Sequence, residues 1–473
     1  MGVSERKGIT GILADFCGKI QMQDIPRDVI ERAKCCLLDY LGAAIVGSTT
    51  ATGKIGLNLV RILHQEGGPQ QATLIGQGIK TSCALAALAN GMSGHAVEMD
   101  DAARYATGLH PGTTIIPACL AMSEYLGARG EEFLLSLILG YEVAGRVGTA
   151  INPSHRYKGF HSTGTVASFG SAAAVARLLH LDTLHTCYAL GIAGSQAGGL
   201  FEFLKENATV KHLHAGRSAQ NGVMAGLLVN NGMTGPTTIL EGDDGFCRAY
   251  ADQADWDYMV DSLGRRFEMN HIYFKIYPAC GHAFSAIEGA LAIHAKHKTD
   301  LREIKKIQVS TYRVAAVLNR QNPATIQEAK FSIPFLVSLA LNKGEVSLRT
   351  LSEKNINDRE IQFLASKVEM IDDAEITGTY PKLRTAVLKV QFHDGPEICE
   401  RVDLPRGMPE RPLTVTDLKN KFFASTAALW SEERARDLMN QVFHIDQEPN
   451  INRLAQIIQM GTKQHAELRD LSL

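Results

Sequence analysis

Helical segments rich in Ala, Gly and Ser fill the first half of the chain, and they constrain the fold more than any other feature. Examples are "KTSCALAALANGMSGHAVEM" and "GTVASFGSAAAVARLLH". Small side chains let neighbouring helices approach closely, so long runs of this kind, broken at Gly and Pro, predict a large and tightly packed helical domain. In "DIPRDVIERAKCCLLDYLGAAIVG" the apolar residues recur at helical spacing, and we expect Asp24 at the N-cap and Pro26 in the first turn.

The pattern changes after residue 268. "REIKKIQVSTYRV" alternates apolar and polar residues, as a strand does, and "LRTAVLKVQFHDGPEICERVDLP" contains two alternating runs around Asp394-Gly395, which predicts a hairpin. Between them, "AKFSIPFLVSLALNKG" predicts a helix that ends at Gly344. From Thr414 the pattern is helical again.

These changes predict a chain that is mainly α with an inserted α+β domain. The boundaries that we expect are a helical domain over 1–268, an α+β lid domain over 269–405 and a return to the helical domain over 406–473. A cleft between two domains is a common place for a small ligand.

The composition excludes several classes of partner. A formal net charge of −2 over 473 residues gives no general attraction to nucleic acid or to an anionic membrane, so an anionic ligand needs a local group of cations. The nine cysteines form neither a CxxC pair nor a zinc-like spacing with histidine, which indicates a reducing compartment. The N-terminus lacks a secretory signal, and the apolar runs are too short or too broken by Gly to span a bilayer, so we expect a cytoplasmic protein.

The stretch "HAVEMDDAARYATGLHPG" over 95–112 gathers an unusual number of titratable groups. Glu98, Asp100 and Asp101 are so close in sequence that their repulsion must be offset by solvent, hydrogen bonds or cations. A solvated loop would satisfy this need, and so would an active site that receives cations from elsewhere in the chain. A third interpretation is structural: the two aspartates cap a helix or bind Arg104.

Cationic partners are present in three later stretches. "GFHSTGT" places His161 before a helix, where exposed backbone N–H groups favour an anion, and in "KHLHAGRSAQNG" Lys211 and His214 lie on one helix face, three residues apart. "FKIYPACGHAF" contributes Lys275 and His282 at the domain junction. For each stretch the alternative is an ordinary solvated or core position.

Six stretches in this order resemble the MmgE/PrpD family of 2-methylcitrate dehydratases and cis-aconitate decarboxylases. They are "DIPRDVIERAKCCLLDYLGAAIVG", "HAVEMDD…HPG", "GFHSTGTVASFGSAAAVARLL", "KHLHAGRSAQNGVMAGLL", "FKIYPACGHAFSAIEGAL" and "AKFSIPF". The resemblance implies a homodimer, a small di- or tricarboxylate substrate, and chemistry next to a carboxylate without a metal, an iron–sulfur cluster or another cofactor.

The resemblance also implies that Asp100, Asp101, His110, His161 and Lys275 lie in the active site, and the charges of the other stretches add further candidates. Proton transfer is expected from Asp100, His110 and His161, and charge stabilisation from Lys211 and Lys275. The expected substrate-binding residues are Glu98, Asp101, Arg104, His214, His282, Lys330 and Ser332.

We predict a hydro-lyase of dehydratase type that acts on a 2-methylcitrate-like hydroxy acid. Cis-aconitate-type decarboxylation and epimerisation of a dicarboxylate such as iminodisuccinate remain alternatives, and so does a non-catalytic carboxylate-binding protein. Members that decarboxylate tend to carry a tyrosine shortly before the Asn-Arg pair, where this chain has Val317, and this absence counts against decarboxylation.

Overall fold

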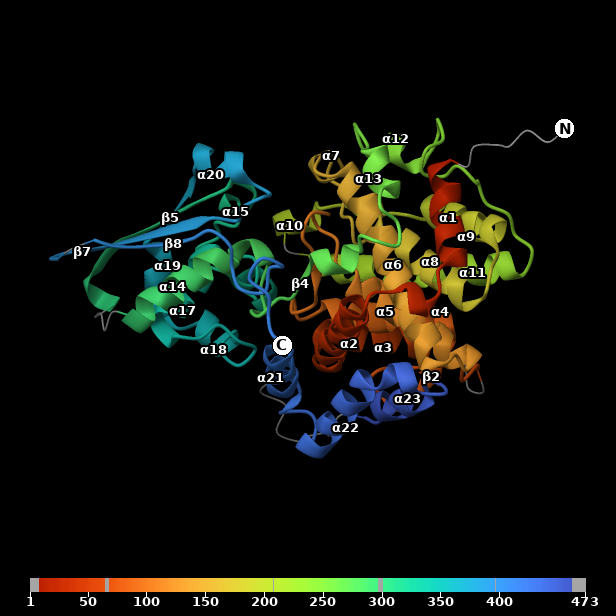
Figure 1. Ribbon diagram of the computed structural model, residues 1–473. Coiled ribbons are helices and arrows are strands. Elements are labelled where there is room, and N and C mark those ends of the chain that lie inside the picture. The colour runs from red at the N-terminus through yellow and green to blue at the C-terminus, as the bar shows by residue number, and fades with distance from the viewer. Residues whose placement is uncertain (1–7, 64–67, 207, 297–300, 396, 462–473) are drawn as a thin grey trace. The chain divides into compact units, whose positions relative to one another are not determined.

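The computed structural model describes residues 8–63, 68–206, 208–296, 301–395 and 397–461. It divides into two compact units (Figure 1). We call Met1–Tyr273 with Thr414–Gln464 the helical unit, and Phe274–Leu413 the α+β unit. The first residues of the chain, on which the prediction about a secretory signal rests, lie outside the described residues.

The helical unit is built from long, closely packed helices, as predicted from the small residues. A Cβ atom added to Gly91 would lie 2.8 Å from Cα of Gly216, and one added to Gly140 would lie 2.9 Å from the carbonyl oxygen of Gly170. Glycine at these positions therefore permits the close approach of α4 to α11 and of α6 to α8. The helices of this unit are α1 (Ile9–Lys19), α2 (Arg27–Gly47), α3 (Ala51–Leu63), α4 (Cys83–His95), α5 (Gly112–Leu126), α6 (Gly130–Ile151), α7 (Ser154–Tyr157), α8 (Ala167–Leu178), α9 (Thr183–Ser195), α10 (Phe203–Glu206), α11 (Val210–Asn230), α12 (Phe246–Tyr250), α13 (Trp256–Val260), α21 (Val415–Thr426), α22 (Glu432–Phe443) and α23 (Asn452–Gln459).

Two local predictions about helices in this unit are wrong. Helix α2 has Pro26, not Asp24, at its N-cap, because Asp24 ends a short 3₁₀ turn over Met22–Asp24. Helix α6 is long and apolar enough to cross a membrane by length and composition, contrary to our expectation. Of the residues in its most apolar stretch, 94% are buried within the protein, which is typical of a core helix.

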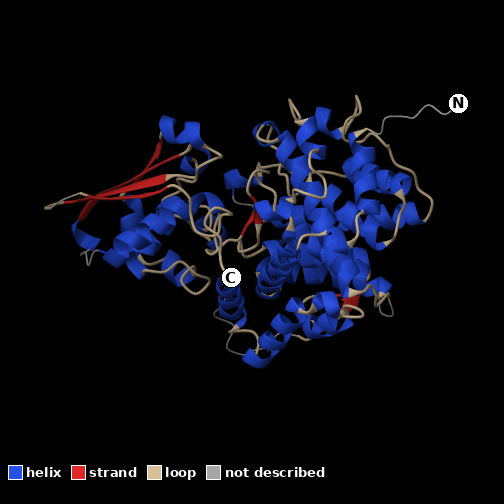
Figure 2. Ribbon diagram, viewed as in Figure 1, coloured by secondary structure: helices blue, strands red, loops and turns tan. Residues whose placement is uncertain are grey.

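The α+β unit contains a four-stranded sheet with the order β6-β5-β7-β8. Its strands are β5 (Ile304–Thr311), β6 (Val368–Asp372), β7 (Ala386–Phe392) and β8 (Ile398–Val402). Strands β7 and β8 pair antiparallel across the predicted hairpin, whereas β5 and β6 are parallel. Buried residues face each other in register, as Val309 and Leu388 do, and helices α14 (Phe284–Lys296) and α17 (Ile333–Lys343) pack on the sheet (Figure 2). Its shorter helices are α15 (Arg313–Ala316), α16 (Ile326–Ala329), α18 (Glu353–Ile356), α19 (Arg359–Ser366) and α20 (Ala374–Thr379).

The predicted fold class, mainly α with an inserted α+β domain, is confirmed. The hairpin at Asp394-Gly395 and the helix that ends at Gly344 are also confirmed; Gly344 caps α17 with a φ of +65°. After the insertion, α21 packs against α2, and Lys421 of α21 donates to Asp39 and to the carbonyl oxygen of Met99. All nine cysteines are free thiols.

Candidate active site

The acidic stretch is buried, so the solvated-loop interpretation is wrong. It runs from the end of α4 through the short strand β3 (Ala102–Ala103) to the start of α5, and β3 pairs with β4 (Ile272–Tyr273). The exposed fractions of Glu98, Asp100 and Asp101 are 1%, 0% and 2%. Buried carboxylates need partners, because desolvation of an unpaired charge costs several kcal/mol.

Glu98 finds its partner on a distant helix. Its φ of +56° is unusual for a residue with a side chain, and the carboxylate forms an ion pair with Lys211 in the first turn of α11. Both side chains are buried. The charge of Lys211 is therefore balanced inside the protein before any ligand arrives.

Asp100 lies between two histidines. Its Oδ2 atom is 3.0 Å from Nδ1 of His95, the last residue of α4, and 2.8 Å from Nδ1 of His110. His110 precedes α5, and its Nδ1 also lies 2.9 Å from the carbonyl oxygen of Asp101. One carboxylate oxygen thus faces two imidazole rings.

Asp101 points to a different set of partners. Its Oδ1 accepts a hydrogen bond of 2.9 Å from the backbone N–H of Gly112, the first residue of α5, and its Oδ2 accepts one of 2.7 Å from the hydroxyl of Tyr141. Burial raises the pKa of Asp101 to about 7, although the Tyr141 hydroxyl opposes this shift. These contacts support the capping interpretation for Asp101.

His161 and His214 form a second pair. Their Nδ1 atoms are 2.9 Å apart, so one ring donates and the other accepts. Burial, followed by the nearby His214 and Lys211, keeps the pKa of His161 well below its usual value. Burial also lowers the pKa of His214 to about 4. Both rings are therefore neutral near pH 7.

Three of the backbone N–H groups after His161, which we expected to be available to an anion, donate within the protein. The N–H of Thr163 donates to the carbonyl oxygen of Gly108, and those of Gly164 and Thr165 donate to the carbonyl oxygen of His161. Two of these donors serve a carbonyl group of the turn itself, and the third links the turn to the acidic stretch. These three N–H groups are therefore not available to an anion.

The two histidine pairs belong to one group, which we call the histidine cluster. The ring centroid of His95 lies 4.7 Å from that of His110, 6.3 Å from His161 and 6.0 Å from His212. The centroids of His161 and His214 are 5.2 Å apart. No role was predicted for His95 or His212, although both stand in stretches that carry predicted site residues. The signal for His95 was its position five residues before Asp100, at the end of a helix.

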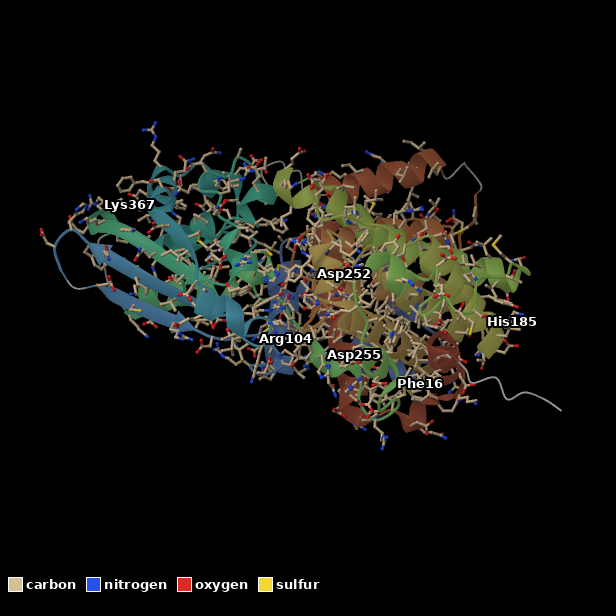
Figure 3. The ribbon with its side chains drawn as sticks, turned by 90° about the horizontal axis from the view of Figure 1, so that it is seen from above. Phe16, Arg104, His185, Asp252, Asp255 and Lys367 are labelled. Atoms are coloured by element: carbon tan, nitrogen blue, oxygen red, sulfur yellow. The ribbon has the colours of Figure 1, made fainter. Side chains whose placement is uncertain are left out.

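Arg104 lies in the helical unit and is 1% exposed (Figure 3). Its backbone N–H donates to the carbonyl oxygen of His271, and its guanidinium lies 5.3 Å from the ring centroid of Tyr105. The hydrogen bond to His271 ties the acidic stretch to the segment that precedes β4.

The remaining predicted residues lie in the α+β unit. Lys275 and Lys330 are buried, and Nδ1 of His282 is 2.8 Å from the hydroxyl of Tyr312. The hydroxyl of Ser332 accepts from the backbone N–H of Phe335 and donates to the carbonyl oxygen of Arg320, so it caps α17. The roles predicted for these residues toward a substrate stay predictions.

Within the described ranges, His95, Asp100 and His110 form a set that could offer ligands to a metal ion, since their ligand atoms lie within 4.8 Å of one another. Each ring Nδ1 already faces the Asp100 carboxylate at hydrogen-bond distance. The two Nδ1 atoms therefore already have an acceptor in this carboxylate.

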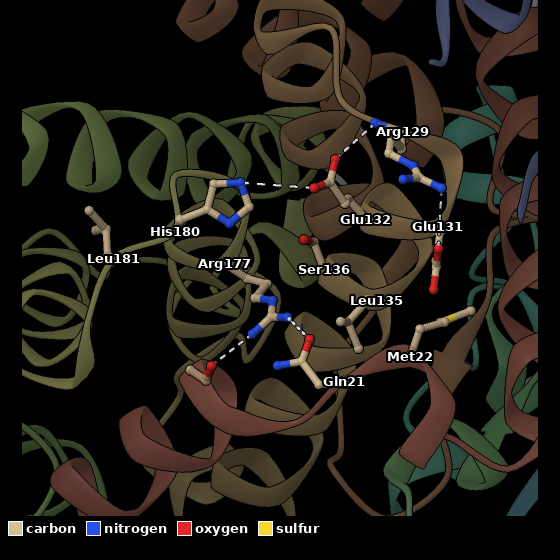
Figure 4. A pocket seen from close by; sticks show the side chains of 11 residues that line it. Gln21, Met22, Arg129, Glu131, Glu132, Leu135, Ser136, Arg177, His180 and Leu181 are labelled. Carbon is tan, nitrogen blue, oxygen red and sulfur yellow. Dashed lines mark hydrogen bonds and ion pairs between the residues drawn. The ribbon is translucent and has the colours of Figure 1, made fainter. Parts of the chain in front are cut away.

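A pocket of about 440 Å³ lies elsewhere in the helical unit and contains none of the predicted site residues (Figure 4). Arg177 donates there to the carbonyl oxygens of Cys17 and Gly18 and to the side chain of Gln21, and Glu132 accepts from the backbone of Arg129. Because these charged groups bind neighbouring parts of the chain, we place the candidate active site at the histidine cluster and not in this pocket.

Two family profiles match the chain. The MmgE/PrpD N-terminal domain matches residues 11–259, and the MmgE/PrpD C-terminal domain matches residues 277–445. Among characterised proteins, a cis-aconitate decarboxylase of Aspergillus terreus is 25% identical over 482 residues, which covers 97% of each chain. The cis-aconitate decarboxylase of Homo sapiens is 28% identical over 454 residues, covering 93% of this chain and 92% of the relative. A probable 2-methylcitrate dehydratase of Saccharomyces cerevisiae is 23% identical over 450 residues, covering 89% of this chain and 86% of the relative.

Proposed function

Because the chain belongs to the MmgE/PrpD family, we propose that it is an enzyme that acts on a small di- or tricarboxylate at the carbon next to a carboxylate. The observation that carries the proposal is the histidine cluster beside Asp100 and Lys211. Buried titratable groups with shifted pKa values are typical of acid–base catalysis.

Removal of a proton next to a carboxylate requires an unprotonated base and a cation where negative charge develops. His161, held neutral by burial, is the proposed base. Lys211 is the proposed cation, and the substrate carboxylate competes with Glu98 for it. In the dehydratase reaction, a group must also protonate the departing hydroxyl, and we assign this step to His110, whose side chain is 12% exposed.

We propose dehydration of a 2-methylcitrate-like hydroxy acid as the reaction. Decarboxylation is the second candidate, because the relatives from Aspergillus terreus and Homo sapiens are named cis-aconitate decarboxylases. Epimerisation of a dicarboxylate would use the same proton abstraction. The three reactions differ in what replaces the broken bond. Dehydration removes a C–H proton and expels the protonated hydroxyl as water, decarboxylation breaks a C–C bond with loss of CO₂ and adds a proton to carbon, and epimerisation removes a C–H proton and returns one to the opposite face.

The test is incubation of the protein in D₂O with citrate, 2-methylcitrate, cis-aconitate and substituted succinates, monitored by ¹H NMR. Loss of water from a hydroxy acid supports dehydration, CO₂ release from cis-aconitate supports decarboxylation, and C–H exchange without a change of formula supports epimerisation. Saturable binding without conversion and without deuterium uptake would contradict an enzymatic function and favour a carboxylate-binding protein.

We expect activity to be independent of a metal ion. In the proposed mechanism His161 and His110 transfer the protons and Lys211 supplies the positive charge, so no step requires a Lewis acid. Turnover should therefore be unchanged after dialysis against EDTA. Complete loss of turnover that one added metal restores would contradict this expectation.

We also propose that the protein is a homodimer. Helix α3 has an apolar face on which Ile55, Ile62 and Leu63 are 55%, 76% and 56% exposed, and residues at this spacing share one side of a helix. Burial of such a face in a second copy would remove it from water. Ile62→Glu is expected to shift the protein towards monomers in sedimentation velocity, whereas Leu184→Glu, at an exposed apolar position on α9, is the control. A wild-type monomer at micromolar concentration would exclude the dimer.

A further inference from the structure

His95 is the most deeply buried member of the histidine cluster. It is 0% exposed, and its Nδ1 lies 3.0 Å from Oδ2 of Asp100. The same oxygen lies 2.8 Å from Nδ1 of His110. His95 and His110 therefore share one carboxylate oxygen, although they come from the two ends of the acidic stretch.

The hydrogen bonds determine which nitrogen of each ring carries a proton. Nδ1 of His110 faces two acceptors, the carboxylate of Asp100 and the carbonyl oxygen of Asp101, so it must be the donor. Nδ1 of His95 faces the same carboxylate and must also donate. Each neutral ring then has its lone pair on Nε2, which is the atom that can take up a proton.

Burial separates the roles of the two rings. The side chain of His110 is 12% exposed, so a ligand can reach it. Nε2 of His95 is buried and has no hydrogen-bond partner among the residues that the structure describes. Its ring neighbours are His110, His161 and His212, and the charged groups around it are Asp100, Glu98 and Lys211. A ring in such surroundings acts through Asp100 and does not contact solvent.

We propose that His95 is a positioning residue that sets the basicity of His110 by donating to the carboxylate that both rings share. The inference rests on the proposed function, in which His110 exchanges a proton with the substrate. A carboxylate that accepts one hydrogen bond fewer carries more negative charge toward its remaining partner and stabilises the protonated form of that ring. Loss of the His95 donor therefore keeps His110 protonated to a higher pH and lets the Asp100 carboxylate rotate.

The experiment compares His95→Leu with His95→Asn. The leucine variant lacks the donor, whereas the asparagine amide nitrogen can occupy the position of Nδ1 and donate to Asp100. We expect His95→Leu to lower kcat by about tenfold to a hundredfold with little change in KM, because the substitution disturbs the orientation of His110, a reacting group, and not substrate binding. Because His110 must be protonated to donate to the departing hydroxyl, the alkaline limb of the pH–rate profile should move to higher pH. His95→Asn should recover most of kcat and return the limb toward its wild-type position.

A second measurement does not depend on turnover. Diethyl pyrocarbonate modifies only the neutral imidazole, so the pH dependence of its reaction with His110, measured by peptide mass spectrometry, reports the basicity of that ring. In His95→Leu the midpoint pH of this reaction should rise by about half a pH unit or more. Such a rise corresponds to an increase on the order of a few-fold in the proton affinity of His110. The matched control is His155→Leu, which removes another buried histidine, one bound to Thr165 and Tyr250. It should leave the midpoint unchanged.

The outcomes separate the two proposals. If the wild-type protein converts no carboxylate in the panel, the proposed function fails, while the modification of His110 still tests His95. Equal midpoints in folded wild-type and His95→Leu protein would overturn the role of His95, and so would equal behaviour of the leucine and asparagine variants. If His95→Leu does not fold, His95→Gln replaces it, because its amide takes the position of Nε2 and leaves Asp100 without the donor.

Discussion

Asp100→Asn and His110→Gln are each expected to lower turnover by about a hundredfold or more, the usual effect of losing an acid–base group. The Asp100 carboxylate accepts from Nδ1–H of His110 and so keeps the proton on that nitrogen. In Asp100→Asn, one of the two orientations of the amide turns its NH₂ group toward this N–H, so that two donors face each other. His110→Gln removes the only ring of the Asp100 group whose side chain is partly exposed. The measurement is kcat with whichever substrate the NMR panel identifies.

Controls for this prediction lie on the surface of the same unit. Asp252→Asn and His185→Gln make the same chemical changes at side chains that are 67% and 49% exposed, and Figure 3 labels both residues. Turnover in these variants should equal that of the wild type. Circular dichroism checks that every variant is folded. Wild-type turnover in folded Asp100→Asn and His110→Gln would remove the acidic stretch from the catalytic site.

The second large effect concerns stability. Lys211→Met leaves the Glu98 carboxylate buried without its ion-pair partner, and breaking a buried pair in this way costs about 3–5 kcal/mol of the free energy of unfolding. The double variant Lys211→Met/Glu98→Gln removes both charges and should recover most of the lost stability. It should not recover turnover, because the proposed cation is absent.

Urea denaturation monitored by tryptophan fluorescence can measure this effect. Both tryptophans, Trp256 and Trp430, lie in the helical unit that contains the pair, so the signal reports the unfolding of that unit. Lys205→Met is the matched control, since its partner Glu202 is 71% exposed and the pair is open to solvent. Its midpoint should stay close to that of the wild type. A Lys211→Met variant as stable as the wild type would show that the Glu98–Lys211 pair is not needed for the fold.

Several elements can be predicted from the sequence because their causes are local. The alternation in "KKIQVST" predicts β5, the Asp394-Gly395 turn predicts the pairing of β7 with β8, and Gly344 ends α17 with a positive φ that glycine adopts without strain. The small residues in the first half of the chain predict close helix packing, because short side chains let the helix backbones approach wherever two helices meet. The assignment of the stretches with titratable residues to the active site came from the resemblance to a known family.

The sequence by itself thus determined the helices, the hairpin and the stretches to which we assign the proposed chemistry. The tertiary structure alone decided which side chains meet. Glu98 and Lys211 are 113 residues apart, and His161 and His214 are 53 apart, so their contacts depend on how α4, α8 and α11 pack. The same holds for Asp101, whose carboxylate binds Tyr141 of α6. The sequence patterns that predict helices and strands repeat every few residues, so they are local. The pairing of buried charges is set by long-range packing. Desolvation allows only the arrangements in which every buried charge has a partner.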